Sequence, residues 1–231
     1  MEDVPYGSLL ALRLLLLRDL QPATYSHLLL LASLLPEWRA TKGWLEGHQP
    51  TVALIREELG MQQFAEEEIL EVLAILSTNA FSKFLEPRAS GGEVVGTQIR
   101  VVYVLAAMMA HSCLPNAEQV SSLTPATCPQ AIHSIEEGLR IQLRATLAIP
   151  AGTSITISYT ELLAPTAIRY LQGWPVYTGF SRQFELLNSK LFVCCCPRCA
   201  DPRELGSLAQ GVKCSACLRC VPGGLSYYYY R

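Results

Sequence analysis

The chain has little charge and no excess of either sign. Its 231 residues are 16% charged, and the formal net charge is −2. A near-neutral chain lacks the basic surface that nucleic-acid phosphates attract, which argues against a nucleic-acid-binding protein. Hydrophobic residues make up 50% of the chain, so it can bury a real core and is not disordered in bulk. Its length suits one large domain or two small ones.

Apolar runs long enough to cross a membrane are also lacking. The two Leu-rich stretches, 9–17 and 28–35, are short; Arg13 interrupts the first and Pro36 ends the second. A span needs about 20 apolar residues, and a signal peptide needs a clearer cleavage region than the chain offers. Both stretches are therefore interpreted as buried helices.

The number of cysteines is odd, so they cannot all pair in disulfides within the chain. There are nine, and most of them lie close together after residue 190. In a chain without a secretory signal, such spacing indicates metal binding rather than disulfides. We therefore expect a reducing compartment, the cytoplasm or the nucleus.

Helical patterns fill the first third of the chain, and β patterns follow. The clearest helix, 65–76, has apolar residues three and four apart behind a glutamate-rich first turn. Residues 139–149 and 153–159 alternate and predict a hairpin with one buried face. Further expected elements are two helices within 7–35, a loop at 36–50 packed down by Trp38 and Trp44, a helix at 51–60, a strand within 99–109, a surface insertion at 118–136 and a helix near 184–189.

A polar loop, residues 110–116, follows the expected strand. It brings His, Ser, Cys and Asn to one place, and Pro115 stops regular structure there because it has no backbone N–H. His111 is most simply a hydrogen-bonded structural histidine, Asn79 a helix-end residue and Tyr159 a core tyrosine. The position of Tyr159 at the tip of a strand, before a turn into the cysteine region, also suits a functional role.

The cysteine region contains a Cys-x-Cys-x-x-Cys motif at Cys194, Cys196 and Cys199. Three thiolates at this spacing can hold one Zn2+ but leave its fourth tetrahedral corner open. Cys113, in the polar loop, is the candidate for that corner. Two alternatives remain: Cys195 replaces Cys194 or Cys196, or the cluster is only a set of buried thiols.

A second cysteine group lies near the end of the sequence. Cys214, Cys217 and Cys220 have zinc-ligand spacing, and Cys128 would have to reach over to complete the site. A second zinc and a partial, vestigial site are equally compatible with this pattern.

Together, these segments resemble the SET-domain protein-lysine methyltransferases of the SMYD family, in its arthropod SmydA-like branch. The family's Asn-His-Ser-Cys-x-Pro-Asn motif is similar to residues 110–116, and its Gly-Glu-Glu-Ile-x-Ile-Ser-Tyr strand to 152–159. Its Phe-x-Cys-x-Cys-x-x-Cys segment is matched by 192–199, and its Thr-Asn-Ala-Phe segment by 78–81.

The resemblance implies a fold and a set of roles. The fold would be α+β: a SET-type β-fold with a pseudoknot, a helical SET-I-like insertion N-terminal to it, and a Cys-rich zinc-binding post-SET segment. Tyr159 would be the catalytic residue. The cofactor S-adenosylmethionine would be contacted by Asn79, His111, Asn116 and Phe192, and Zn2+ would be bound by Cys113, Cys194, Cys196 and Cys199.

The chain also departs from the family pattern. Ala110 replaces the first Asn of the motif, and Thr153 and Ser154 replace an acidic pair. No Gly-x-Gly-type cofactor loop and no MYND-type zinc-finger spacing precede residue 110, so we expect a fragment that lacks the N-terminal part of the SET domain. The expected divisions are 1–85 (SET-I-like), 86–165 (SET core), 166–205 (linker helix and post-SET zinc module) and 206–231 (partial Cys-containing segment).

The function that the resemblance implies is transfer of a methyl group from S-adenosylmethionine to a lysine of a protein, histone or non-histone. The alternative is a catalytically degenerate SET scaffold that acts as a zinc-stabilised interaction module. Ala110 favours the alternative, whereas Tyr159, Asn116 and the cysteine set favour the enzyme. In either case we expect a protein partner, no direct nucleic acid and no membrane.

Overall fold

The structure is a computed structural model that describes residues 7–85, 97–121, 141–162, 164, 170–171, 174–175, 181–201, 204–206, 212–213 and 220–221. The described residues are a mixture of helices and strands, as the α+β prediction requires. None of the described helices is both long and apolar enough to cross a membrane. The chain divides into two compact units, Met1–Met108 with Ser121–Gln142, and Met109–Val120 with Leu143–Arg231.

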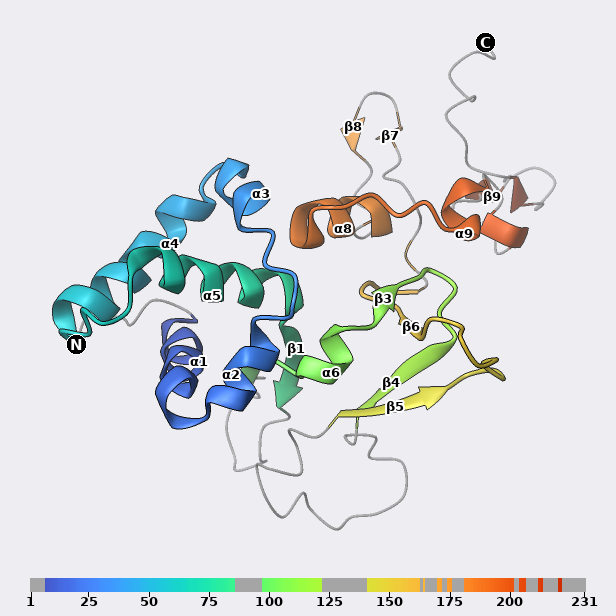
Figure 1. Cartoon of the computed structure of the whole chain (residues 1–231). Coiled ribbons are helices and arrows are strands. Elements are labelled where there is room, and N and C mark those ends of the chain that lie inside the picture. Colours follow the sequence, from blue (N-terminus) through green and yellow to red (C-terminus); the bar gives the residue numbers. More distant parts are fainter. Residues whose placement is uncertain are drawn as a thin grey trace, which may run out of the picture. The chain divides into compact units, whose positions relative to one another are not determined.

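The first unit is mainly helical. Helix α5 lies among α1, α3 and α4 (Figure 1). A two-stranded antiparallel sheet, β1 with β2, pairs Phe81 with Val101 and Leu85 with Thr97. The elements are α1 (Ser8–Leu20), α2 (Pro22–Leu28), α3 (Leu35–Ala40), α4 (Trp44–Ala53), the π-helix η1 (Leu54–Glu58), α5 (Glu66–Asn79), β1 (Phe81–Leu85), β2 (Thr97–Val101) and α6 (Val104–Ala107).

The second unit contains short strands and the helices of the cysteine region. Its described strands pair two by two: β3 with β6 in parallel, β4 with β5, β7 with β8, and β9 with β10. The elements are β3 (Ala110–His111), β4 (Ala117–Ser121), β5 (Ile141–Ala145), β6 (Thr156–Ile157), β7 (Tyr170–Leu171), β8 (Trp174–Pro175), α8 (Arg182–Lys190), α9 (Pro197–Ala200), the 3-10 helix η2 (Glu204–Gly206), β9 (Val212–Lys213) and β10 (Cys220–Val221).

Helix α5 carries the core of the first unit. The helix predicted at 65–76 is confirmed and extends to Asn79. Its first turn contains only glutamates, Glu66, Glu67 and Glu68, which suit the positive end of the helix dipole. The residues behind them are buried on several sides, because other helices flank α5. They are Ile69, Leu70, Val72, Leu73, Ala74, Ile75 and Leu76.

The tryptophans of the predicted 36–50 loop are buried, but most of that segment is helical. Trp38 and Trp44 stack at 6.1 Å between ring centroids. Their indole N–H groups donate to hydroxyls of α5, Trp38 to Thr78 at 2.9 Å and Trp44 to Ser77 at 3.1 Å. The loop prediction is therefore wrong, whereas the packing role of both indoles is confirmed.

The predicted helix start at Thr51 is also wrong. Helix α4 begins at Trp44, after Gly43, whose φ of 81° lies in the left-handed region that glycine favours. The Thr51 hydroxyl lies 2.7 Å from that of Ser8 in the core and does not cap a helix. The predicted end at Gly60 is confirmed, since η1 stops at Glu58 and Gly60 has a φ of 66°.

Two β predictions are wrong. The strand expected within 99–109 ends at Val101, and α6 follows; a short apolar run does not distinguish helix from strand. The expected hairpin of 139–149 with 153–159 does not form, because β5 pairs with β4 and β6 pairs with β3. Leu143 is 40% exposed and Leu147 58%, so alternation there marks no buried face. Most of the expected insertion at 118–136 lies outside the described residues.

Glu68 connects three helices of the first unit. Its carboxylate accepts from the Arg18 guanidinium of α1 at 2.8 Å and from the Tyr25 hydroxyl of α2 at 3.0 Å. The Arg18 guanidinium also lies 4.4 Å from the centroid of the Phe64 ring. Burial and this hydrogen bond to Glu68 raise the pKa of Tyr25 to about 12, so its hydroxyl stays a donor.

Glu68→Ala should lower the free energy of unfolding by about 1–3 kcal/mol, because it leaves Arg18 and Tyr25 without their shared acceptor. The measurement is urea unfolding followed by far-ultraviolet circular dichroism. Glu66→Ala is the matched control, since Glu66 lies in the same first turn but makes only an exposed contact with Gln49. Equal losses in the two variants would show that only helix-dipole stabilisation is involved.

Candidate active site and metal centre

The polar loop 110–116 is held against the segment 154–159 by backbone contacts. β3 pairs in parallel with β6, Ala110 opposite Thr156 and His111 opposite Ile157. The Ser112 N–H then donates to the Ile157 carbonyl at 3.0 Å. These contacts bring two segments that are more than forty residues apart in the sequence side by side.

Asn116 closes the same junction with its side chain. Its Oδ1 accepts from the Thr156 backbone N–H at 2.8 Å, and its Nδ2 donates to the Ser154 carbonyl at 2.9 Å. Its own backbone N–H donates to Thr156 Oγ1 at 3.1 Å. One hydrogen of the carboxamide NH2 group has no protein acceptor among the described residues. Asn116 is thus a structural link with one donor left over.

His111 connects the loop to Tyr159 and to Cys113. Its Nδ1 accepts from the Tyr159 backbone N–H at 3.0 Å, so in the neutral ring the proton is on Nε2. Nε2 lies 3.2 Å from the Cys113 sulfur and therefore donates to it. Burial, and next the positive charge of Arg182, lower the pKa of His111 to about 4. The ring is consequently neutral in ordinary buffers.

Tyr159 lies among aromatic rings. Its ring centroid is 5.2 Å from that of His111 and 6.5 Å from that of Phe192, which meets it edge to face. Its hydroxyl donates to the Met109 carbonyl, and burial raises its pKa. The ammonium of Lys190 lies 5.7 Å from the Tyr159 ring centroid, within cation–π range.

The four predicted metal ligands converge. The sulfur atoms of Cys113, Cys194, Cys196 and Cys199 all lie within 4.8 Å of one another. The Cys113 sulfur is 3.4 Å from that of Cys199 and 3.9 Å from that of Cys194. A tetrahedral zinc with bonds of about 2.3 Å needs sulfur atoms about 3.8 Å apart, so this group can hold a metal ion.

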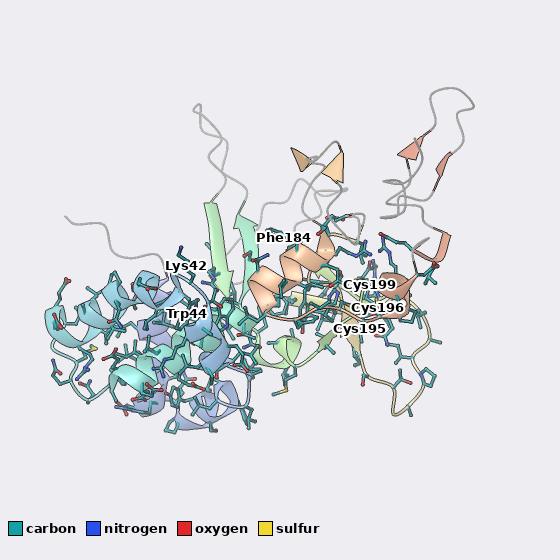
Figure 2. All side chains as sticks on the ribbon, turned by 90° about the horizontal axis from the view of Figure 1, so that it is seen from above. Lys42, Trp44, Phe184, Cys195, Cys196 and Cys199 are labelled. Atoms are coloured by element: carbon teal, nitrogen blue, oxygen red, sulfur yellow. The ribbon has the colours of Figure 1, made fainter. Side chains whose placement is uncertain are left out.

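Cys195 lies outside the group. It is exposed, and its thiol points to the Val193 carbonyl. Figure 2 shows Cys195, Cys196 and Cys199 together near helix α9. The alternative in which Cys195 replaces a neighbour is therefore not the arrangement in this structure. The second cysteine group lies outside the described residues: Cys128, Cys214 and Cys217, and the side chain of Cys220.

The surroundings of the four sulfurs shift the pKa values of their thiols in different directions. Burial raises the pKa of Cys113, with a hydrogen bond from Arg182 acting against it. Burial also raises the pKa of Cys194. For Cys196 burial acts in the same direction, but the backbone N–H groups of Cys199 and Cys113 outweigh it and bring the pKa to about 7. A bound cation would favour the thiolate at all of these positions.

Buried charges around the cysteine group were not predicted from the sequence. Arg182, Arg198 and Glu204 are all buried, and both guanidinium groups bind Glu204 Oε2, at 3.2 Å and 3.0 Å. Gln183 holds the Cys194 backbone from α8, accepting from its N–H at 2.9 Å and donating to its carbonyl at 2.6 Å. Of these residues, only Arg198 had a signal in the sequence, because it lies inside the cysteine motif.

Asn79 lies in the first unit, and the other predicted site residues lie in the second. Its Nδ2 donates to the Ala32 and Ile75 carbonyls at 2.7 Å and 2.9 Å, at the end of α5. The helix-end role that its sequence position suggested is thus present. The roles of Asn79, His111, Asn116 and Phe192 toward a cofactor stay predictions.

Comparison with known proteins supports the motif-based resemblance. No family model matches the chain. A Drosophila melanogaster protein, "SET domain-containing protein SmydA-8, isoform B", is 31% identical over 142 residues, which cover 62% of this chain and 25% of the relative. Isoform A is 30% identical over 148 residues, covering 64% and 25%. The match therefore spans about a quarter of the length of these relatives. Over the matched residues, the chain is thus similar to SET proteins of the SmydA type.

Proposed function

We propose that the chain is a SET-type protein-lysine N-methyltransferase that uses S-adenosylmethionine and contains a structural zinc bound by Cys113, Cys194, Cys196 and Cys199. One observation carries the proposal. Cys113 lies in the loop that binds the Tyr159 segment, and its sulfur is also part of the cysteine group. The predicted metal centre and the predicted catalytic tyrosine are thus connected through His111.

The cysteine group suits zinc for three reasons. All four ligands are sulfur, which is typical of closed structural zinc sites. The sulfurs are free thiols at distances too long for disulfides. Cys113 and Cys194 are buried, so solvent has little access to a bound ion. With no position left for water or substrate, such a zinc would stabilise the fold and take no part in the reaction.

The residues near Tyr159 suit a cofactor with a planar base and a cationic sulfur. Phe192 is partly exposed beside the His111 and Tyr159 rings, and Asn116 retains a donor. S-adenosylmethionine supplies an already activated methyl group, so the protein contributes mainly by positioning. The role toward the cofactor that the resemblance implies for Asn79 stays a prediction. The parallel β3–β6 pairing supports a pseudoknotted arrangement of these segments.

Tyr159 would orient the lysine that receives the methyl group. Its hydroxyl direction is fixed by the Met109 carbonyl, and its raised pKa keeps it protonated. The ammonium of Lys190 over its ring indicates that a primary ammonium is tolerated beside this tyrosine. The substrate would be a lysine side chain of a protein, histone or non-histone. Ala110 favours the alternative, a degenerate SET scaffold that acts as an interaction module.

Cys113→Ser should abolish stoichiometric zinc binding, because the hydroxyl is a poor substitute for the fourth thiolate. The measurement is metal analysis of protein purified with zinc present. Cys195→Ser is the matched control and should keep its zinc, since that thiol lies outside the group. An unchanged zinc content in Cys113→Ser would refute the ligand assignment.

The unmutated chain should release or absorb heat on binding S-adenosylmethionine, measured by calorimetry with zinc bound. Tyr159→Phe should bind the cofactor similarly but methylate about 100-fold more slowly, since loss of orientation costs on this order. Methyl transfer is followed with labelled cofactor on core histones and a lysine-peptide array. The absence of any heat from the unmutated chain would reject the enzyme and favour the interaction module.

A further inference from the structure

Two buried arginines surround one carboxylate next to the cysteine group. Arg182 and Glu204 have fully buried side chains, and that of Arg198 is 9% exposed. Two guanidinium groups and one carboxylate sum to a charge of +1, while four thiolates around Zn2+ sum to −2. A buried cation is costly unless an opposite charge lies close by. The arginine cluster and a tetrathiolate metal centre would therefore stabilise each other.

Arg182 joins this cluster to the cysteine group. Its Nε donates to the Cys113 sulfur at 3.4 Å. Its NH1 and NH2 both donate to Glu204 Oε2 at 3.2 Å, and NH1 also donates to the Ala164 carbonyl. A planar guanidinium held on these sides cannot turn, so the direction of Nε–H toward the sulfur is fixed.

Arg198 is a natural comparison for Arg182. It binds the same carboxylate oxygen, through Nε at 3.1 Å and NH2 at 3.0 Å. Its NH1 donates to the carbonyls of Leu162 at 2.7 Å and Cys113 at 3.4 Å. Among the described residues, the acceptors of these Arg198 hydrogen bonds are thus oxygen atoms of the protein. The two arginines share burial, charge and counterion, and differ in the bond to sulfur.

We propose that Arg182 is a positioning residue of the metal centre: its Nε–H donates to the Cys113 thiolate and thereby weakens that sulfur as an electron donor and retards metal release. Glu204 and the Ala164 carbonyl hold the guanidinium in place for this bond. His111 donates to the same sulfur from another direction, at 3.2 Å. Cys113 is thus the proposed ligand whose sulfur accepts hydrogen bonds from both His111 and Arg182. The inference rests on the proposed zinc site.

Replacement of zinc by Co2+ gives the centre an optical signature. Sulfur-to-cobalt charge transfer moves to lower energy when a thiolate loses an N–H donor. In Arg182→Met we expect this shift, together with metal affinity about 10–100-fold weaker in competition with a chelator. Arg198→Met removes an equal buried charge and a bond to Glu204, but leaves the N–H···S bond. Its charge-transfer band should match that of the unmutated chain.

Equal band shifts in the two variants, or no shift in Arg182→Met, would overturn the inference. Arg182→Lys keeps the charge but loses the fixed Nε–H, so its band should also move to lower energy; a band at the unmutated position would show that charge alone suffices. If the unmutated chain binds no cobalt, the zinc site itself is refuted. Binding of one ion with unshifted variant bands would refute only the role of Arg182.

Loss of a buried guanidinium can prevent folding, so a second measurement uses the unmutated chain. Loaded with an NMR-active cadmium isotope, it should show a scalar coupling between cadmium and the Arg182 Nε–H proton, transmitted through the N–H···S bond. That proton should also exchange slowly with water because it is buried. A slowly exchanging proton without coupling, or a rapidly exchanging one, would overturn the inference.

Discussion

The position of the Cys113 sulfur is the constraint on which the second unit depends. The sulfur receives an N–H from His111 at 3.2 Å and one from Arg182 at 3.4 Å, and it lies 3.4 Å from the Cys199 sulfur. It therefore joins the polar loop, helix α8 and the cysteine motif at one atom. A thiol is a weak acceptor for two donors, and a thiolate is a strong one, so these two N–H donors favour the thiolate and act against the burial that raises the pKa of Cys113.

His111 connects the Cys113 sulfur to the backbone of Tyr159. Because His111 Nε2–H is directed to Cys113, Nδ1 is left as the acceptor for the Tyr159 backbone N–H. The backbone position of Tyr159 is thus set by one ring nitrogen, and its hydroxyl direction by the Met109 carbonyl. If the proposed zinc is bound, its loss would free Cys113 first, then the His111 tautomer, and only then Tyr159. A structural ion can in this way control the geometry of a site that it does not touch.

The sequence predicted which four cysteines come together, but not their surroundings. The ligand spacing is local: a Cys-x-Cys-x-x-Cys motif offers three sulfurs to a tetrahedral metal, and Cys113 in the polar loop is the predicted fourth, which the structure places beside them. The α5 helix was also predictable, since apolar periodicity and acidic N-terminal residues agreed. Strand partners were not, because alternation in 139–149 specifies a strand but not its neighbour. The Arg182–Glu204–Arg198 cluster could not be predicted either, because tertiary contacts between charged residues leave no periodic pattern in the sequence.

The motif residues differ in what they reveal about activity. His111 and Asn116 both have structural roles. His111 hydrogen-bonds to Tyr159 and Cys113. Asn116 hydrogen-bonds to the backbone of Ser154 and Thr156. A chain that had lost catalysis would still need them in order to fold, so their presence does not separate enzyme from scaffold. Ala110 is different, because it is exposed and contributes to β3 only through its backbone. The fold places no demand on that side chain, so this departure from the family motif is the position that separates the enzyme from the scaffold in the proposal.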